Sequence, residues 1–395
     1  DKMGVRFTGV MAGAIMVVGA SVKFWAISTT FEHGATAFGI TSLPIWGEFT
    51  ISAQVGYAAI GFAIFAVGVE IAGITVSKVI VKWFKGYEMA MAMGVQMAIA
   101  RIGTALAMAA PVPLATAFGS PSEPLLSAPL AFGLILMIIG LISFFAFNVM
   151  DRKLDKSVAD AGETVEEEAF RLSDLVLIIK NKGFWLIALL CVLFYSSVFP
   201  FLKYAADLMV NKYGVSPSTA GLIPAILPFG TLFLTPFFGG LYDKKGKGAT
   251  IMIIGSAMLI GVHSLFSVPF LDHWSIAVLL VLILGIAFSL VPAAMWPSVP
   301  KIIPEKQLGS AYSLIFWIQN WGLMGVPFLI GVVLDKYCIT GQVTVEGLTR
   351  NTYDYTIPMM IFTGFGILAI FVAIALKAED KKKGYGLELP NMTQD

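Results

Sequence analysis

Long apolar runs, separated by short polar segments, follow one another along almost the whole chain. A helix of about 20 apolar residues crosses the roughly 30 Å hydrocarbon core of a bilayer, because each residue adds about 1.5 Å. The first run is not a signal peptide, since it lacks a small-residue cleavage site and another span follows it. The pattern predicts ten membrane-spanning helices, near residues 7–28, 51–77, 87–110, 126–148, 184–206, 219–241, 249–269, 274–299, 307–334 and 356–377.

The composition agrees with a chain that faces lipid. Apolar residues make up 57% and charged residues 13% of the 395 residues, and the mean hydropathy is +0.84, which excludes a water-soluble globular protein. A net charge of +1 provides no general positive field for nucleic acid. Cys191 and Cys338 lie at different predicted depths, so a disulfide-stapled scaffold is excluded as well.

Basic residues gather on one side of the predicted spans. With residue 1 in the cytoplasm, the alternating loops place most of the 26 basic residues on the cytoplasmic side, and only Lys212, Lys336 and Arg350 on the opposite side. This asymmetry puts both termini inside. The one long polar connector, residues 151–182, contains an acidic run and separates four spans from six.

Two charged residues lie deep inside predicted spans. Glu70 lies about 15 residues before the turn near Lys85 and Arg101 about 16 after it, so at about 1.5 Å per residue both sit at one depth on adjacent antiparallel helices. A lone charge there costs at least about 2.5–3.5 kcal/mol, so neither faces lipid. Two interpretations stay open. The first is a permanent salt bridge between the helices. The second is a pair held apart across a wet cavity, where Glu70 binds a cationic group and Arg101 an anionic one.

Aromatic and amide side chains mark the second set of spans. They occur in helices that Pro or Gly interrupts, where they could line a cavity and contact a ligand. Each of them taken alone is also compatible with helix packing. The candidates for substrate contact are Tyr195, Trp296, Gln319 and Asn320.

No pattern in the sequence supports catalysis. The chain has no phosphate-binding G-x-x-x-x-G-K-[ST] motif, no His-rich metal cluster and no Ser-His-Asp set. We therefore expect neither an enzyme nor a cofactor or metal, and we expect no ATP-driven pumping by this chain alone.

Two segments that lead from cytoplasmic loops into spans are similar to each other, namely residues 1–6 (DKMGVR) and 239–247 (GGLYDKKGK). Both resemble the G-x-x-x-D-[RK]-x-G-[RK] signature of the major facilitator superfamily, which lies between helices 2 and 3 of each six-helix half. The resemblance implies an all-α polytopic membrane protein, with ten helices visible and the first two missing before Asp1. The implied divisions are an N-terminal half at 1–150 (helices 3–6), a cytoplasmic linker at 151–182, a C-terminal half at 183–378 (helices 7–12) and a cytoplasmic tail at 379–395.

In that superfamily the signature acts as a latch that holds the inner gate shut. The alternative is a pair of solvated cytoplasmic turns whose basic residues follow the positive-inside rule. The resemblance assigns the latch to Asp1, Arg6, Gly239, Asp243, Lys244 and Lys247.

A narrower resemblance covers residues 55–336. The order and spacing of several motifs are similar to the family of major facilitator superfamily domain-containing protein 1. These motifs are Gly68-Val69-Glu70, KWFKGYE at 82–88, Ala100-Arg101-Ile102-Gly103, Val198-Phe199-Pro200-Phe201, Trp296-Pro297, PEKQLGSAY at 304–312 and Ile318-Gln319-Asn320. The resemblance implies facilitated dipeptide transport, with the two termini of the dipeptide bound at Glu70 and Arg101, and for animal members a glycosylated partner.

The sequence departs from that family in two places. Its connector at 34–48 is longer, and its only N-glycosylation acceptor, Asn391-Met392-Thr393, falls on the cytoplasmic side. These departures favour a prokaryotic inner-membrane protein, with the lysosomal membrane as the alternative. The glycosylated accessory subunit is expected only for a eukaryotic protein, and a monomer is expected in either case.

The sequence thus predicts a membrane transporter that moves dipeptides by alternating access, either by facilitated diffusion or coupled to an ion. A zwitterionic dipeptide supplies partners for both buried charges. One alternative is a carrier of small organic or inorganic anions, in which Arg101 binds the anion and Glu70 orients it. Another is a membrane scaffold or sensor that transports nothing.

Overall fold

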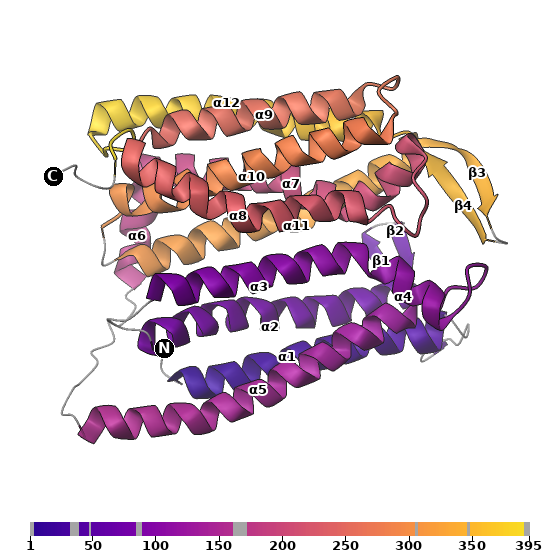
Figure 1. Cartoon of the computed structure of the whole chain (residues 1–395), viewed down its shortest axis with the longest axis horizontal. Helices are drawn as coiled ribbons and strands as arrows, with labels where there is room; N and C mark the ends of the chain where they lie inside the picture. Colours follow the sequence, from indigo (N-terminus) through magenta and orange to yellow (C-terminus); the bar gives the residue numbers. More distant parts are fainter. Residues whose placement is uncertain are drawn as a thin grey trace. The chain divides into compact units, whose positions relative to one another are not determined.

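A computed structural model describes residues 4–31, 39–46, 49–83, 89–160, 172–304, 307–345 and 348–390. The described chain is mostly helical, with two short hairpins (Figure 1). Its elements are α1 (Gly4–Trp25), the π-helix η1 (Ala26–Phe31), β1 (Ser42–Trp46), β2 (Phe49–Ser52), α2 (Ala53–Trp83), α3 (Met89–Ala109), α4 (Pro111–Phe118), α5 (Ser127–Asp160), α6 (Leu172–Lys180), α7 (Lys182–Tyr213), α8 (Leu222–Lys245), α9 (Gly248–Ser267), α10 (Trp274–Ile302), α11 (Leu308–Tyr337), β3 (Ile339–Val345), β4 (Leu348–Tyr353) and α12 (Thr356–Lys383).

The predicted spans are confirmed as helices. Within the described residues, nine helices are long and apolar enough to cross a membrane, or ten if a bent pair forms one span. The bent pair belongs to the third predicted span, where α3 ends at Ala109 and α4 begins at Pro111 after a bend of 51°. Proline has no N–H to donate and its ring clashes with the preceding turn, so a helix breaks or begins there.

The chain divides into two compact units. The first comprises residues 1–97 and 110–169, and the second comprises residues 98–109 and 170–395. The second unit therefore contains the C-terminal part of α3 as well as α6 to α12. Within the first unit, α1 packs against α2 and α5.

Glycines allow α1 and α2 to approach each other closely. A Cβ at Gly61 would lie 2.7 Å from the backbone nitrogen of Lys23 and 2.9 Å from the carbonyl oxygen of Gly19. Backbone atoms cannot move aside as a side chain can, so these positions require glycine. Such small-residue contacts are the usual means of packing helices in lipid.

In the second unit, α7 is the central helix. It packs against α10, α11 and α12, while α8 and α9 pack against α10, and α9 also packs against α12. Phe184, Phe194, Phe201 and Leu208 on α7 are fully buried, as expected for a helix that is apolar on all sides. His263 on α9 is also fully buried and lies between the rings of Phe201 and Phe362. Neither of its ring nitrogens makes a well-formed hydrogen bond with a described residue.

Two antiparallel hairpins, which the sequence pattern did not predict, occupy the longer connectors. Strands β1 and β2 join α1 to α2, and β3 and β4 join α11 to α12. Polar pairs cross the second hairpin, where the Gln342 amide donates to Asn351 at 3.0 Å and the hydroxyls of Thr340 and Thr352 lie 3.0 Å apart. Figure 1 shows this hairpin at the end of the second unit opposite α6.

The close approach of α1 and α2 leads to a prediction. Gly61→Ala should lower the thermal midpoint of the detergent-solubilised protein, because the added methyl group meets backbone atoms, and overpacking of this kind costs about 1–3 kcal/mol. Gly73→Ala is the matched control, since it lies on the same helix and its Cβ would meet no atom within 4 Å. If both variants melted at the same temperature, the glycine contact would not be what joins these helices.

Candidate functional site

Arg101 lies in an aromatic environment in the second unit. It is half-buried on α3, and its guanidinium carbon lies 5.3 Å from the centre of the Phe288 ring on α10. Among the described residues of its own unit, Arg101 forms no ion pair. The negative face of an aromatic ring attracts a guanidinium and stabilises it where water is scarce. The ring therefore holds the cation without neutralising its charge.

Three further aromatic side chains surround the Phe288 ring. The Tyr195 ring meets Phe288 edge-on at 5.7 Å between centres, and Phe199 meets Phe288 edge-on at 5.4 Å. The Trp296 Nε1–H donates to the Tyr195 hydroxyl at 3.0 Å. Tyr195 and Arg101 thus contact the same Phe288 ring. We call Tyr195, Phe199, Phe288 and Trp296 the aromatic wall.

Prolines shape the α10 part of the wall. Pro292, Pro297 and Pro300 lie inside α10, and each removes the N–H that would bond the carbonyl four residues earlier. The carbonyl left by Pro300 is that of Trp296, and it accepts instead from the Tyr312 hydroxyl at 3.2 Å. Such substitute partners are how a membrane helix tolerates proline. The backbone around Trp296 is thereby fixed from α11.

The structure places the two amide candidates differently. Gln319 is buried, and its Oε1 accepts a hydrogen bond from the Cys191 Sγ–H of α7 at 3.1 Å. This hydrogen bond joins α11 to α7 one turn from Tyr195. The amide oxygen of Gln319 is therefore used in packing the two helices. Asn320 follows directly and is exposed, because successive helical positions point about 100° apart. The adjacent amides thus do not share one face.

Glu70 lies on α2 of the first unit and is exposed. Arg101 belongs to the second unit, so the pairing of these two charges at one depth stays a prediction. The structure brings together Arg101, Tyr195 and Trp296 around Phe288, whereas Gln319 contacts Cys191, one helical turn from Tyr195.

The sequence analysis missed Phe288, the residue that contacts Arg101. It lies in an uninterrupted apolar span, where one Phe among many carries no distinguishing signal. The spacing of Phe288, Pro292 and Trp296 at i, i+4 and i+8 would have placed them near one face of the helix. That spacing, anchored on Trp296, was the available clue.

The N-terminal latch residues divide between described and undescribed parts of the chain. Asp1 lies outside the described residues. Arg6 on α1 pairs with Asp155 at 2.7 Å and with Asp151 at 3.7 Å, both on α5. Helix α5 continues to Asp160, into the segment predicted as the linker, so these partners were not foreseen. Arg6 is thus held inside its own unit.

Lys82 and Trp83 of α2 complete this cluster. Lys82 Nζ donates to both carboxylate oxygens of Asp151, at 2.9 and 2.8 Å, and the Trp83 Nε1–H donates to Oδ1 at 2.9 Å. Asp151 has no exposed side-chain surface. Burial lowers the pKa of Lys82, but its hydrogen bonds to Asp151 and Asp155 outweigh this effect and raise it overall. The cluster joins the ends of α1, α2 and α5.

The C-terminal latch residues lie where α8 turns into α9. Within the second unit, a Cβ at Gly239 would meet no atom within 4 Å, whereas one at Gly248 would lie 2.8 Å from the carbonyl oxygen of Leu387. The close approach in this loop is therefore made by the glycines after Asp243 and Lys244. Lys247 has a positive φ of 61°, and its N–H donates to the carbonyl of Glu388 at 3.0 Å.

The segment after α12 thus folds back against this turn. Glu388 accepts from the backbone N–H and the hydroxyl of Thr250 at 2.9 and 2.7 Å, and Lys377 lies 3.5 Å from the same carboxylate. Lys301 of α10 donates to the carbonyls of Gly386 and Leu389 at 3.0 and 2.9 Å. The predicted tail therefore has an ordered beginning. A latch role for Gly239, Asp243, Lys244 and Lys247 stays a prediction.

Comparison with known proteins identifies the family. The family model described as Major Facilitator Superfamily matches residues 1–327. The chain belongs to the Major Facilitator Superfamily. It is a multi-pass integral membrane protein of a transporter family, and the all-α prediction is confirmed. Within the described residues, no group of three or more His, Cys, Asp or Glu is arranged to hold a metal ion.

Individual proteins of known name or structure are similar to this chain. The human protein named lysosomal dipeptide transporter MFSD1 is 30% identical over 285 residues, which are 70% of this chain and 59% of the human protein. The chain therefore spans less than two thirds of that relative's length. The D-xylose-proton symporter superposes with a TM-score of 0.64 at 14% identity, over 95% of this chain and 81% of the symporter. The peptide transporter POT gives 0.60 at 13%, over 98% and 81%. These structural matches show the shared fold.

The buried carboxylate of Asp151 leads to the second prediction. Asp151→Asn should lower the free energy of unfolding by about 3 kcal/mol, because it removes a fully buried negative charge from between two cations and leaves Lys82 paired only with the partly exposed Asp155. Asp155→Asn is the matched control and should cost about 1 kcal/mol or less, because Asp155 is partly exposed and exposed pairs contribute little. Denaturant unfolding of the detergent-solubilised protein measures both. Equal losses in the two variants would show that burial of Asp151 is not decisive.

Proposed function

We propose that this chain carries the central binding site of a dipeptide transporter that works by alternating access. The observation that carries the proposal is the Arg101 guanidinium in a membrane span, held over the Phe288 ring instead of by a carboxylate of its own unit. A buried cation keeps its charge only if something compensates for the lost water. Attraction to the ring compensates in part for the lost hydration of the cation. A bound anion would supply the rest.

Arg101 suits a carboxylate because its planar fork can make two parallel hydrogen bonds. Tyr195 packs edge-on against the same Phe288 ring, and its hydroxyl already accepts a hydrogen bond from Trp296. Among the described residues, none accepts the hydrogen of that hydroxyl. A carboxylate between the guanidinium and the phenol would receive donors from both. In this proposal Arg101 and Tyr195 bind the C-terminus of the dipeptide.

The aromatic wall favours a peptide over a small inorganic anion. Flat aromatic rings bind peptide planes and side chains by burying apolar surface, with little preference for one side chain over another. In the proposal Glu70 binds the amino terminus, so a dipeptide provides a partner for a charge of each sign. The name of the human relative MFSD1 agrees with this substrate class.

The third prediction separates the two ends of the substrate. Arg101→Gln should weaken uptake of a free dipeptide about 10- to 100-fold, the loss of a charge-assisted pair of about 1.5–3 kcal/mol. It should have little effect on residual uptake of the C-terminally amidated dipeptide. Glu70→Gln should weaken uptake of the free dipeptide but spare the N-acetylated one. Competition against a radiolabelled dipeptide in proteoliposomes measures each combination.

Lys23→Gln serves as the control for this experiment. It removes a charge from another span, where Lys23 lies 5.3 Å from the centre of the Phe62 ring in the first unit, and it should leave uptake unchanged. Competition by single carboxylates, with none by dipeptides, would instead establish a carrier of small anions. No flux of any solute through folded wild-type protein would exclude transport by this chain.

The fourth prediction tests the contact between Arg101 and the Phe288 ring. Phe288→Leu should raise the KM for dipeptides about tenfold, because a cation–π contact in a desolvated site contributes about 2 kcal/mol or less and the leucine cannot replace it. Phe201→Leu is the control, since Phe201 is equally buried on α7 but packs against Phe266 and Phe362. Both variants should lose similar thermal stability. An unchanged KM in Phe288→Leu would show that the ring only fills space.

A further inference from the structure

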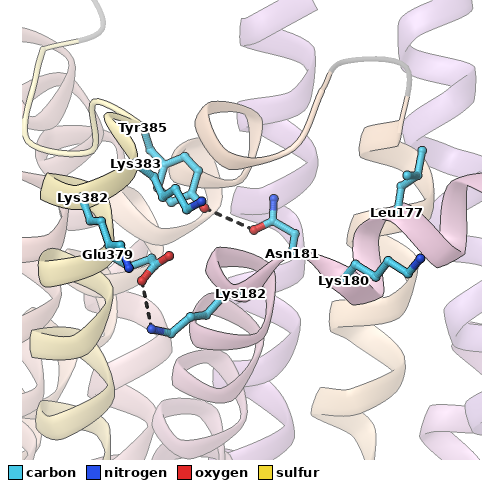
Figure 2. A pocket seen from close by; sticks show the side chains of 8 residues that line it. All are labelled: Leu177, Lys180, Asn181, Lys182, Glu379, Lys382, Lys383 and Tyr385. Atoms are coloured by element: carbon cyan, nitrogen blue, oxygen red, sulfur yellow. Dashed lines mark hydrogen bonds and ion pairs between the residues drawn. The ribbon is translucent and has the colours of Figure 1, made fainter.

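A pocket of about 460 Å³ lies at one end of the second unit, away from the aromatic wall. Its lining residues come from α6, the start of α7, the end of α12 and the segment after it, namely Leu177, Lys180, Asn181, Lys182, Glu379, Lys382, Lys383 and Tyr385 (Figure 2). Helices α7 and α12 are both membrane spans, and the pocket lies at their ends. It therefore sits at the level where hydrocarbon gives way to water.

The lining side chains carry a strong positive charge. Four lysines face one glutamate. The Glu379 carboxylate is only 5% exposed and accepts a hydrogen bond from Lys182 at 2.9 Å, as Figure 2 shows. Lys180, Lys382 and Lys383 are exposed and form no hydrogen bond or ion pair with another described residue. The pocket thus keeps a net charge of three positive units.

The base of the pocket is held in place by neutral groups. Asn181 caps α7 by accepting from the N–H groups of Gly183 and Phe184. Its Nδ2 donates to the carbonyl of Ile302, and the Tyr385 hydroxyl donates to its Oδ1 at 3.3 Å. In Figure 2, Leu177 and Lys180 lie on one side of Asn181 and the Lys182–Glu379 pair on the other. A fixed floor with lysines around it is an arrangement that can bind an anion without rearranging.

Exposed apolar side chains continue from the pocket along α6. Leu177, Val176 and Ile179 are each about half exposed or more, whereas Ile178 is fully buried. Trp185 of α7 is partly exposed and donates its Nε1–H to the carbonyl of Ile179 at 2.7 Å. A short amphipathic helix with an adjacent tryptophan is typical of the membrane interface. An occupant of this surface needs an anionic end and an apolar end.

We propose that this pocket binds the phosphate-bearing headgroup of an anionic phospholipid, whose acyl chain lies along the exposed face of α6. Basic pockets between membrane helices bind such headgroups through charge and hydrogen bonding. The volume is within the range of ordinary ligand pockets. The bound lipid joins α6 to the ends of α7 and α12. This site is independent of the substrate and needs no dipeptide to be tested.

The test uses the purified full chain in a neutral detergent, titrated with phosphatidylglycerol or with phosphatidylcholine of the same acyl chains. Native mass spectrometry and the thermal midpoint report binding. The expected result is one retained phosphatidylglycerol and a raised midpoint, with neither effect from phosphatidylcholine. Raising the salt from 50 to 500 mM should weaken the effect, because free ions screen exposed charges.

Variants then locate the lipid. Lys382→Gln combined with Lys383→Gln should weaken phosphatidylglycerol binding roughly 25-fold, at about fivefold for each lysine near the surface. Lys381→Gln is the matched control, because Lys381 is exposed on the same helix end and does not line the pocket. Its loss of binding should be clearly smaller than the loss caused by either pocket lysine. If the double variant does not fold, Lys180→Gln and Lys382→Gln are measured singly.

Several results would overturn the proposal. Equal binding of the two lipids would show that headgroup charge is irrelevant, and equal loss in Lys381→Gln would show general attraction to the helix end. Inorganic phosphate or glycerol 3-phosphate could also raise the midpoint as much as phosphatidylglycerol, with the same dependence on lysines. That outcome would assign the pocket to a soluble phosphate compound and reject the lipid.

Discussion

The constraint that governs this structure is the cost of placing charge where water is scarce. Each charged group that is buried in or near a membrane span needs a partner, and the chain provides different kinds. Asp151 receives two cations and an indole N–H at the helix ends. Arg101, inside its span, lies against an aromatic ring. An ion pair cancels a charge, whereas a ring stabilises it and leaves it able to attract an anion. Arg101 therefore keeps a charge that a ligand can use, whereas the charge of Asp151 is used in joining helices.

The same reasoning applies to backbone groups. Proline inside a span removes a hydrogen bond, and in lipid the freed carbonyl must find another donor. Helix α10 has three prolines, and a hydroxyl from α11 donates to the carbonyl that Pro300 leaves at Trp296. Helix α10 thus depends on α11 for a hydrogen bond to one of its backbone carbonyls. In return, the position of Trp296, and with it the hydrogen bond to Tyr195, is fixed by two helices instead of one.

The sequence predicted the features that follow from periodicity and composition. The spans appear as long apolar runs because lipid imposes their length, and Arg101 was conspicuous because a charge in such a run is rare. Phe288 could not be singled out in the same way, since an apolar residue in an apolar span carries no signal. Asp151 looked like the start of a linker because charge follows the apolar window directly, although the helix continues to Asp160. The hairpins were missed because cross-strand pairs such as Gln342 with Asn351 join residues that no helical period relates.

The contacts at the helix ends also limit which parts can move. Arg6, Lys82 and Asp151 join three helices of the first unit, while Lys301, Thr250 and Glu388 join α9, α10 and the segment after α12 in the second. Every one of these bonds lies within a single unit, so a motion that carries each unit as a body breaks none of them. Helices of the first unit that moved separately would have to separate the buried Asp151 from its cations, which costs several kcal/mol. The charged ends therefore favour rigid units. Arg101 and Phe288 belong to the same unit, so the contact between the cation and the ring is also kept when that unit moves as a body.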